Sequence, residues 1–193
     1  MLQEASKGFQ ATKDEANQAV TSMNLAFLEL YLGDFEAGYL AAVSVLDRVG
    51  AIGDGYRAIA ARNVLGFAAL GLGRRTEARQ AFAESLDLIL AADSPDAVHL
   101  TLTLTGLALT ADTADARSAA RLQGAVDKLD DATTRSPRFR QLERYLEQPL
   151  IDALGADEYA DEKALGAGMD TEAAIALARA LANPENQGAV ARP

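Results

Sequence analysis

The sequence contains no cysteine and no tryptophan, and it has one histidine, His99, among 193 residues. The absence of cysteine excludes disulfide bonds, thiolate metal ligands and a cysteine nucleophile. A lone histidine without cysteine does not make a zinc site, and nothing places a serine nucleophile beside it. We therefore expect a protein that is not an enzyme and that carries no metal or other cofactor.

Basic residues are also scarce, since 18 Lys and Arg stand against 28 Asp and Glu, for a net charge of −10. Nucleic acids bind basic faces, so this balance argues against direct nucleic-acid binding. Residues 1–7 lack the basic start of a signal peptide, and the longest uncharged run, residues 97–111, is shorter than the roughly 20 residues that span a bilayer. We expect a cytoplasmic protein without a membrane partner.

The abundant residues favour helix. Alanine and leucine dominate the 49% of residues that are hydrophobic, and both are strong helix formers. Carboxylates gather at Asp130-Asp131 and within residues 157–162, but acidic neighbours on a helix usually form a solvated face rather than a catalytic pair. The composition predicts an all-α protein without catalytic residues.

One short turn occurs twice, forty positions apart. Leu32-Gly33-Asp34 returns as Leu72-Gly73-Arg74, with helix-like sequence on both sides each time. Glycine tolerates the left-handed geometry of a helix end, and a turn that recurs at this period indicates stacked helical hairpins. Such arrays bind partners and rarely perform chemistry.

Caps and glycines set the predicted helix boundaries. Ser94-Pro95-Asp96 supplies an N-cap hydroxyl and a proline at the first helical position, and Ser136-Pro137 repeats this signal. Residues 100–105 alternate with period two, but we assign them to a helix because they have no second strand to pair with. Gly155 ends one helix and Asp170 caps the last. The predicted helices are 2–10, 14–32, 34–49, 54–72, 75–90, one from Pro95 onward, one from Asp112 or Thr113 to about 130, 137–154, 157–165 and 171–181.

These elements define three predicted regions. Residues 1–132 form helical hairpins, of which the first is incomplete because the helix at 2–10 begins without a cap. Residues 133–182 form a C-terminal helical extension and cap, and residues 183–193 a flexible tail.

The second hairpin resembles a tetratricopeptide repeat. Leu65-Gly66 on its first helix and Ala78 and Phe82 on its second match the family pattern, whereas in the first hairpin Ala42 replaces the phenylalanine. The resemblance implies a right-handed superhelix of tetratricopeptide-like hairpins, closed by two short C-terminal helices. We expect Gly66 to face Ala78 and Phe82 to fill the gap toward the adjacent hairpin. The period exceeds the usual length of about 34 residues, so HEAT-like repeats remain an alternative.

The final third carries a more specific resemblance. Residues 119–125, Ala-Ala-Arg-Leu-Gln-Gly-Ala, are similar to an Ala-Ala-Arg-Leu-Leu-Gly-Ala segment in the C-terminal helical domain of large bacterial signal-transduction ATPases, with Gln123 as a departure. Arg140, Glu143-Arg144 and the segments 153–155 and 173–178 continue the order. This resembles the end of the tetratricopeptide region in LuxR-type and antibiotic-regulatory-type transcriptional regulators. It implies an array that senses a small-molecule or protein signal for ATPase and DNA-binding modules of a parent chain.

Neither module lies in this sequence, which has no G-x-x-x-x-G-K-[ST] phosphate loop and no basic recognition helix. The sequence thus predicts a non-catalytic regulatory domain of a larger bacterial transcriptional regulator, which binds a protein or a small-molecule effector. Two alternatives stay open: a free-standing adaptor protein, and the regulatory domain of a cyclase or kinase.

The candidate binding surface is a concave groove. In stacked hairpins the first helix of each pair lines the inner surface, and aromatic bodies with a few polar groups suit a peptide or small ligand. We expect about half of the candidates to be exposed and the others to belong to the core between repeats. The candidates are Met23, Phe27, Tyr31, Arg62, Asn63, Phe67, His99 and Thr103.

A second candidate is a basic stripe between residues 117 and 144. It could dock an anionic partner or an adjoining module. The alternative is pairing with nearby acids such as Asp127, Asp131 and Glu143, worth about 0.3–0.5 kcal/mol per exposed pair. A homodimer through the truncated first hairpin is also possible. The stripe comprises Arg117, Arg121, Arg138, Arg140 and Arg144.

Overall fold

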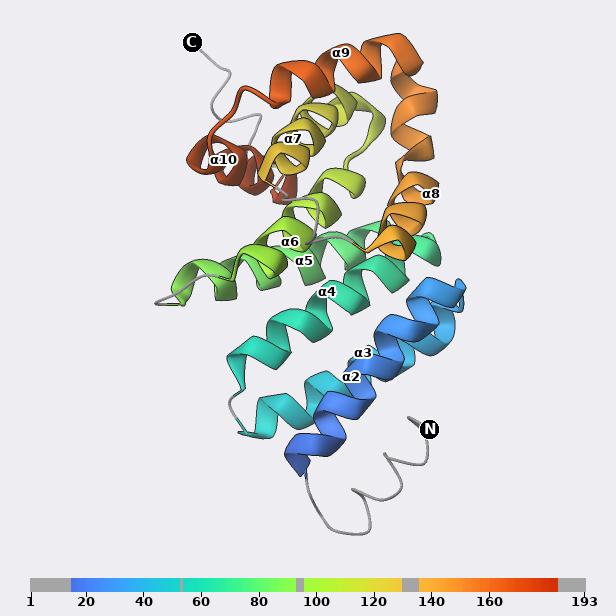
Figure 1. Ribbon diagram of the computed structural model, residues 1–193, viewed down its shortest axis with the longest axis vertical. Helices are drawn as coiled ribbons and strands as arrows, with labels where there is room; N and C mark the ends of the chain where they lie inside the picture. Colours follow the sequence, from blue (N-terminus) through green and yellow to red (C-terminus); the bar gives the residue numbers. More distant parts are fainter. Residues whose placement is uncertain (1–14, 53, 93–95, 130–135, 184–193) are drawn as a thin grey trace. The chain divides into compact units, whose positions relative to one another are not determined.

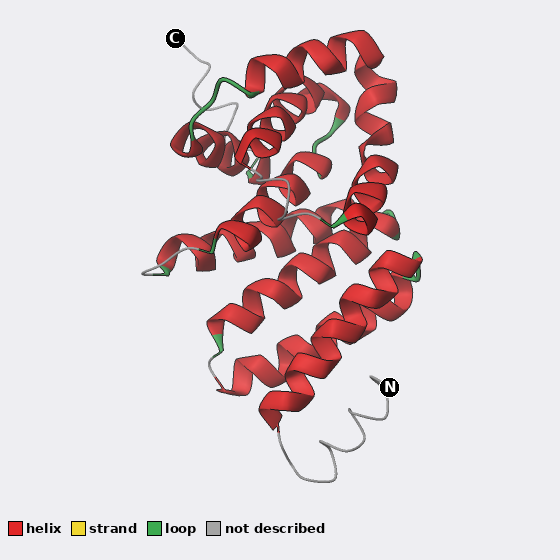
Figure 2. Cartoon of the chain, in the orientation of Figure 1, coloured by secondary structure: helices red, strands yellow, loops and turns green. Residues whose placement is uncertain are grey.

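The computed structural model describes residues 15–52, 54–92, 96–129 and 136–183, and in these ranges every regular element is a helix (Figure 1, Figure 2). The all-α prediction is confirmed for this part of the chain. The chain divides into two compact units, Met1–Ala91 and Ala92–Pro193, so the predicted boundary at 132/133 falls inside the second unit. The predicted helix at 2–10 lies outside the described residues, as does the predicted tail beyond Asn183.

From Glu15 to Ala91, the described part of the first unit forms two helical hairpins. They comprise α2 (Glu15–Leu32) with α3 (Phe35–Ile52), and α4 (Gly55–Gly71) with α5 (Arg75–Ala91). The two turns are confirmed as left-handed, because Gly33 and Gly73 have φ of 79° and 73°. Both α2 and α3 pack against α4, so the hairpins are stacked on each other (Figure 1).

Aromatic rings fill the notches that two glycines leave in α4. A Cβ on Gly66 would lie 2.5 Å from Cζ of Phe82, whose ring meets Phe67 edge-on with centroids 4.9 Å apart. The atoms closest to that Cβ position are therefore ring atoms of Phe82, which packs against α4 of its own hairpin. The ring occupies the space that the missing side chain leaves. Phe35 of the first hairpin fills the corresponding notch at Gly71.

Polar contacts also join the two hairpins beside their turns. The hydroxyl of Tyr39 donates to Glu77, and this hydrogen bond raises the pKa of Tyr39. Arg74 lies over the ring of Tyr39, 4.7 Å from its centroid, and pairs with Glu36 at 3.5 Å. These contacts join the start of α3 to the start of α5.

The second unit has α7 at its centre. This helix packs against α6, α8, α9 and α10. The elements are α6 (Ala97–Leu109), η1 (Thr113–Asp115), α7 (Ala116–Leu129), α8 (Pro137–Leu154), α9 (Ala156–Gly166) and α10 (Thr171–Ala182). The two short C-terminal helices are thus present, and α9 and α10 both cover α7 (Figure 1).

Most of the predicted helix starts in this unit are confirmed. Ser136 accepts a hydrogen bond from the backbone N–H of Phe139 at 3.1 Å, and Asp170 accepts one from Ala173 at 2.8 Å. The cap of α6 is corrected: it is Asp96, which accepts from the N–H of His99 at 2.8 Å, while Ser94 and Pro95 lie outside the described residues. Aspartate and serine are comparable as N-cap residues, so an aspartate next to the first helical turn can cap the helix in place of a serine two residues earlier.

The segment with period-two alternation is helical, as predicted. It lies in α6, where every residue from Thr101 to Leu109 is buried. A helix that is buried on all sides needs no amphipathic stripe, which explains why periodicity by itself favoured a strand in this segment. Of the helices in the described ranges, none has the combined length and apolarity to cross a membrane.

Candidate functional site

The first unit holds six of the eight groove candidates, and only half of these six keep exposed surface. Met23, Asn63 and Phe67 are buried, with Asn63 fully so. Phe27 and Tyr31 on α2 are partly exposed, and their ring centroids lie 6.4 Å apart. These two aromatic side chains are the ones that a ligand on α2 can reach without disturbing the core.

The other two candidates, His99 and Thr103, lie on α6 in the second unit and are buried. Burial lowers the pKa of His99, although the charge of Asp96 acts in the opposite direction. His99 is therefore a neutral core residue at neutral pH. Six of the eight groove candidates thus lie in the first unit and two in the second. Three of the eight, Phe27, Tyr31 and Arg62, are partly exposed.

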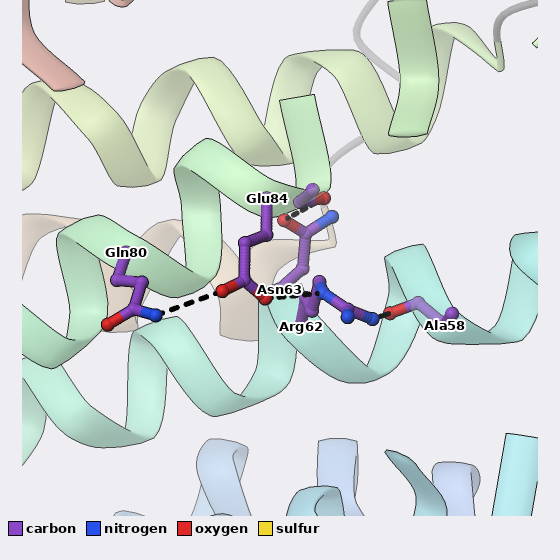
Figure 3. A network of polar contacts seen from close by, with 6 residues as sticks. Ala58, Arg62, Asn63, Gln80 and Glu84 are labelled. Carbon is purple, nitrogen blue, oxygen red and sulfur yellow. Dashed lines mark hydrogen bonds and ion pairs between the residues drawn. The ribbon is translucent and has the colours of Figure 1, made fainter. Parts of the chain in front are cut away.

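Arg62, the third partly exposed candidate, is held by its own hairpin. Its Nε donates to Glu84 on α5 at 3.0 Å and its Nη1 to the carbonyl of Ala58 at 3.5 Å, while Gln80 donates to the other oxygen of Glu84 at 3.0 Å (Figure 3). The guanidinium is thus directed along α4 and toward α5. Its charge is therefore already paired with that of Glu84 in the absence of a ligand.

A buried hydrogen bond lies behind this network. Ser85 donates to Oδ1 of Asn63 at 3.2 Å, and both side chains are fully buried between α4 and α5. This hydrogen bond supports the packing of the hairpin, since a buried Oδ1 of Asn63 left without a donor would cost about 1–3 kcal/mol. Asn63 therefore acts in the core and is not available to a ligand.

The basic stripe separates into two groups with different surroundings. On α7, Arg117 pairs with Glu158 at 2.5 Å and Arg121 with Glu162 at 2.5 Å, so α9 supplies the partners that we expected from closer acids. On α8, Arg138 and Arg144 are exposed, and Arg140 is half-buried. Arg138 and Arg144 on α8 therefore present their charge to solvent.

The helices α7 and α9 approach each other through two reciprocal glycines. A Cβ on Gly124 would overlap the backbone carbonyl of Lys163, and a Cβ on Gly166 would overlap that of Arg121. Backbone therefore touches backbone at this crossing, and only glycine fits at either position. The Arg117–Glu158 and Arg121–Glu162 pairs join the same two helices.

A cluster of buried polar groups lies where α7, α8 and α9 meet. Glu147 of α8 is buried and accepts hydrogen bonds from Tyr159 at 2.9 Å and from Gln123 at 3.3 Å. Lys163 lies 3.5 Å from the same carboxylate and 2.8 Å from Asp127. Glu143, one turn earlier on α8, is also buried. Gln123, the departure from the family segment, thus joins a carboxylate in the core.

The environment fixes the protonation of two members of this cluster. Burial and the charge of Glu147 raise the pKa of Tyr159. For Lys163, burial lowers the pKa, but the hydrogen bond with Asp127 and the charge of Glu147 outweigh it, and the pKa is raised. Both groups stay protonated at neutral pH, so neither is prepared to accept a proton as a general base would.

Sequence reasoning did not identify this cluster. Its members are far apart in the chain, and the residues around Glu147 and Lys163 give these two the same sequence context as ordinary surface residues. Two signals were present: Gln123 occupies a position where the family segment has leucine, and Glu143 and Glu147 lie one turn apart beside the apolar residues of α8. Across the described parts of the chain, no group of three or more His, Asp and Glu side chains is placed to hold a metal ion.

Comparison of the chain with protein-family models, with curated proteins and with solved structures gave no match. The described fold defines the class: an all-α protein with a pair of stacked helical hairpins followed by a helical unit organised around α7. Function must therefore be argued from these features and from the resemblance in the sequence.

Proposed function

We propose that this chain is a non-catalytic regulatory domain of a larger bacterial transcriptional regulator of the signal-transduction ATPase type, and that its hairpins form a tetratricopeptide-like array. One observation carries the proposal. The two hairpins of the first unit share the same left-handed glycine turn, and their first helices, α2 and α4, contact each other. In arrays of this kind the first helices line the binding surface.

The binding surface that we propose is the exposed side of α2 around Phe27 and Tyr31. These rings are partly exposed and close together, and aromatic side chains contribute strongly to binding because they bury a large area with few rotatable bonds. A protein segment or a small-molecule effector bound there would act on an attached ATPase through a difference in affinity between two of its states.

The first test is the size of the natural polypeptide, measured by immunoblot of source cells with an antibody against this domain. A band far above 20.3 kDa supports the proposal. Mass spectrometry of that band should then find an ATPase with a phosphate loop and a DNA-binding module. A band at 20.3 kDa contradicts the proposal in this form and leaves the free-standing adaptor.

The second test uses the full-length product. Phe27→Ala with Tyr31→Ala should weaken the response of ATPase activity to its effector by about tenfold or more, because two aromatic contacts are lost. Leu40→Ala is the control, since Leu40 is an exposed apolar side chain on α3, a second helix outside the proposed surface. An equal response in both variants would remove α2 as the binding surface.

A further inference from the structure

Two neighbouring helices of the second unit expose faces of opposite charge. The α8 face consists of Arg138, Gln141, Arg144 and Tyr145, all exposed, with Tyr145 64% exposed. The acids within the first three turns of α8, Glu143 and Glu147, are buried, so they do not offset this charge at the surface. The α8 face is therefore basic, with one large ring in it.

The α9 face consists of Asp157, Asp161 and Leu165, which follow one another at intervals of four residues and so form one stripe. Leu165 is 63% exposed. The only basic residue of α9, Lys163, is directed to Asp127 and Glu147 within the unit. The α9 face is therefore acidic, with one large aliphatic side chain at its end.

We propose that the α8 face binds the α9 face of a second copy of this chain, and that the two copies form a two-fold dimer with both contacts present. Charge decides which faces can meet: two α8 faces repel each other, as do two α9 faces, and only the crossed arrangement brings opposite charges together. A two-fold axis then makes the contact twice.

The spacing and the exposed apolar residues fit this arrangement. Arg138 and Arg144 lie at the two edges of the α8 face, about 9 Å apart along the helix axis, whereas Asp157 and Asp161 lie one turn apart, about 6 Å along α9. Arginine side chains are long enough to bridge the difference between these two spacings. The unit already joins two helices in the same way, through Arg117–Glu158 and Arg121–Glu162. Exposed ion pairs contribute little by themselves, so Tyr145 and Leu165 supply the apolar contact.

The test is sedimentation of the whole chain over a range of concentrations. The dimer should form at low ionic strength and weaken by about tenfold or more between about 0.02 M and about 0.5 M salt. Arg138→Glu with Arg144→Glu should weaken dimerisation by about a hundredfold, and Asp157→Arg with Asp161→Arg should do the same. Arg179→Glu on α10, an exposed arginine outside both faces, should leave it unchanged.

The decisive sample is an equal mixture of the two double variants. One variant then has two acidic faces and the other two basic faces, so each is monomeric alone and the mixture forms a heterodimer with both contacts restored. Circular dichroism confirms that each variant is folded. A wild-type chain that stays monomeric, a dimer that tolerates both charge reversals, or a mixture that stays monomeric would each overturn the proposal. None of these outcomes bears on partner binding at α2.

Discussion

The two units of this chain use glycine and polar groups in different ways. In the first unit, Gly66 and Gly71 leave notches that the rings of Phe82 and Phe35 fill, so side chains mediate the packing. In the second unit, Gly124 and Gly166 let two backbones touch, and nothing between them can adjust. The first unit is therefore expected to tolerate changes in packing that the second does not.

The same contrast holds for charge. The charged groups of the first unit, such as Arg62 with Glu84 and Arg74 with Glu36, lie at least partly in solvent. The second unit buries Glu143 and Glu147 and holds Lys163 beside them. Buried charge is strongly destabilising once a partner is lost, so the second unit depends on a few side chains that cannot be exchanged one at a time.

The largest expected effect is that of Gly124→Ala or Gly166→Ala. Either added methyl group would overlap backbone of the opposite helix, and we expect a loss of about 4 kcal/mol or more in the free energy of unfolding, measured by chemical denaturation. Gly50→Ala, where an added Cβ meets nothing within 4 Å, is the control and should be neutral or stabilising. If amide hydrogen exchange in the Gly124→Ala or Gly166→Ala variant showed lost protection in the first unit and not in the second, the contrast between the two units would be wrong.

The next effect is that of Lys163→Met, which removes the cation beside the buried carboxylate of Glu147. Complete removal of one member of a buried pair costs about 3–5 kcal/mol, and since Lys163 is partly exposed we expect about 3 kcal/mol, by denaturation. The matched control is Lys128→Met on α7, an exposed lysine, with an expected effect within about 0.5 kcal/mol. Equal effects of the two changes would show that the buried cluster does not depend on its lysine.

A smaller effect is expected for Gly66→Ala in the first unit. The added methyl group would meet the ring of a side chain and not backbone, and we expect a loss of about 2 kcal/mol. Phe82→Leu in the same chain should recover part of this loss, because a smaller side chain leaves space for the methyl group. A double variant less stable than the sum of the two single changes would contradict this account of the notch.

The smallest effect concerns the only histidine. Burial lowers the pKa of His99 in the folded protein, so below the ordinary value of about 6.5 the unfolded chain binds a proton that the folded chain does not. The free energy of unfolding should therefore fall by about 1 kcal/mol as the pH is lowered from about 7 to about 5. His99→Leu should remove this slope, and a slope that persists in the variant would assign it to other groups.

Local signals in the sequence predicted much of the fold. Gly33, Gly73 and Gly155 end helices with positive φ, and Ser136 and Asp170 cap helices, because each of these effects depends on a few adjacent residues. The candidate site was predicted less well. Helical position can indicate which residues share a face, but not which of those faces is buried, and so Asn63, Phe67 and Thr103 proved to be core.

The missed contacts all join residues that are distant in sequence. Arg117 and Arg121 find acids 41 positions away on α9, and the notch at Gly66 receives a ring from the next helix. Such pairs depend on how helices cross. A single sequence records the residue types on each helix but not the crossing, so the acidic residues after Gly155 were read as a solvated face.

The buried helix α6 has a consequence for the unfolded chain. Its sequence from Leu100 to Thr105 alternates leucine and threonine within an uncharged run, and this pattern has high β-propensity with no charged or proline residue to interrupt it. Folding conceals the segment inside the second unit. Once heat opens that unit, the released segment can pair with copies of itself, and aggregation rather than refolding is then the expected outcome.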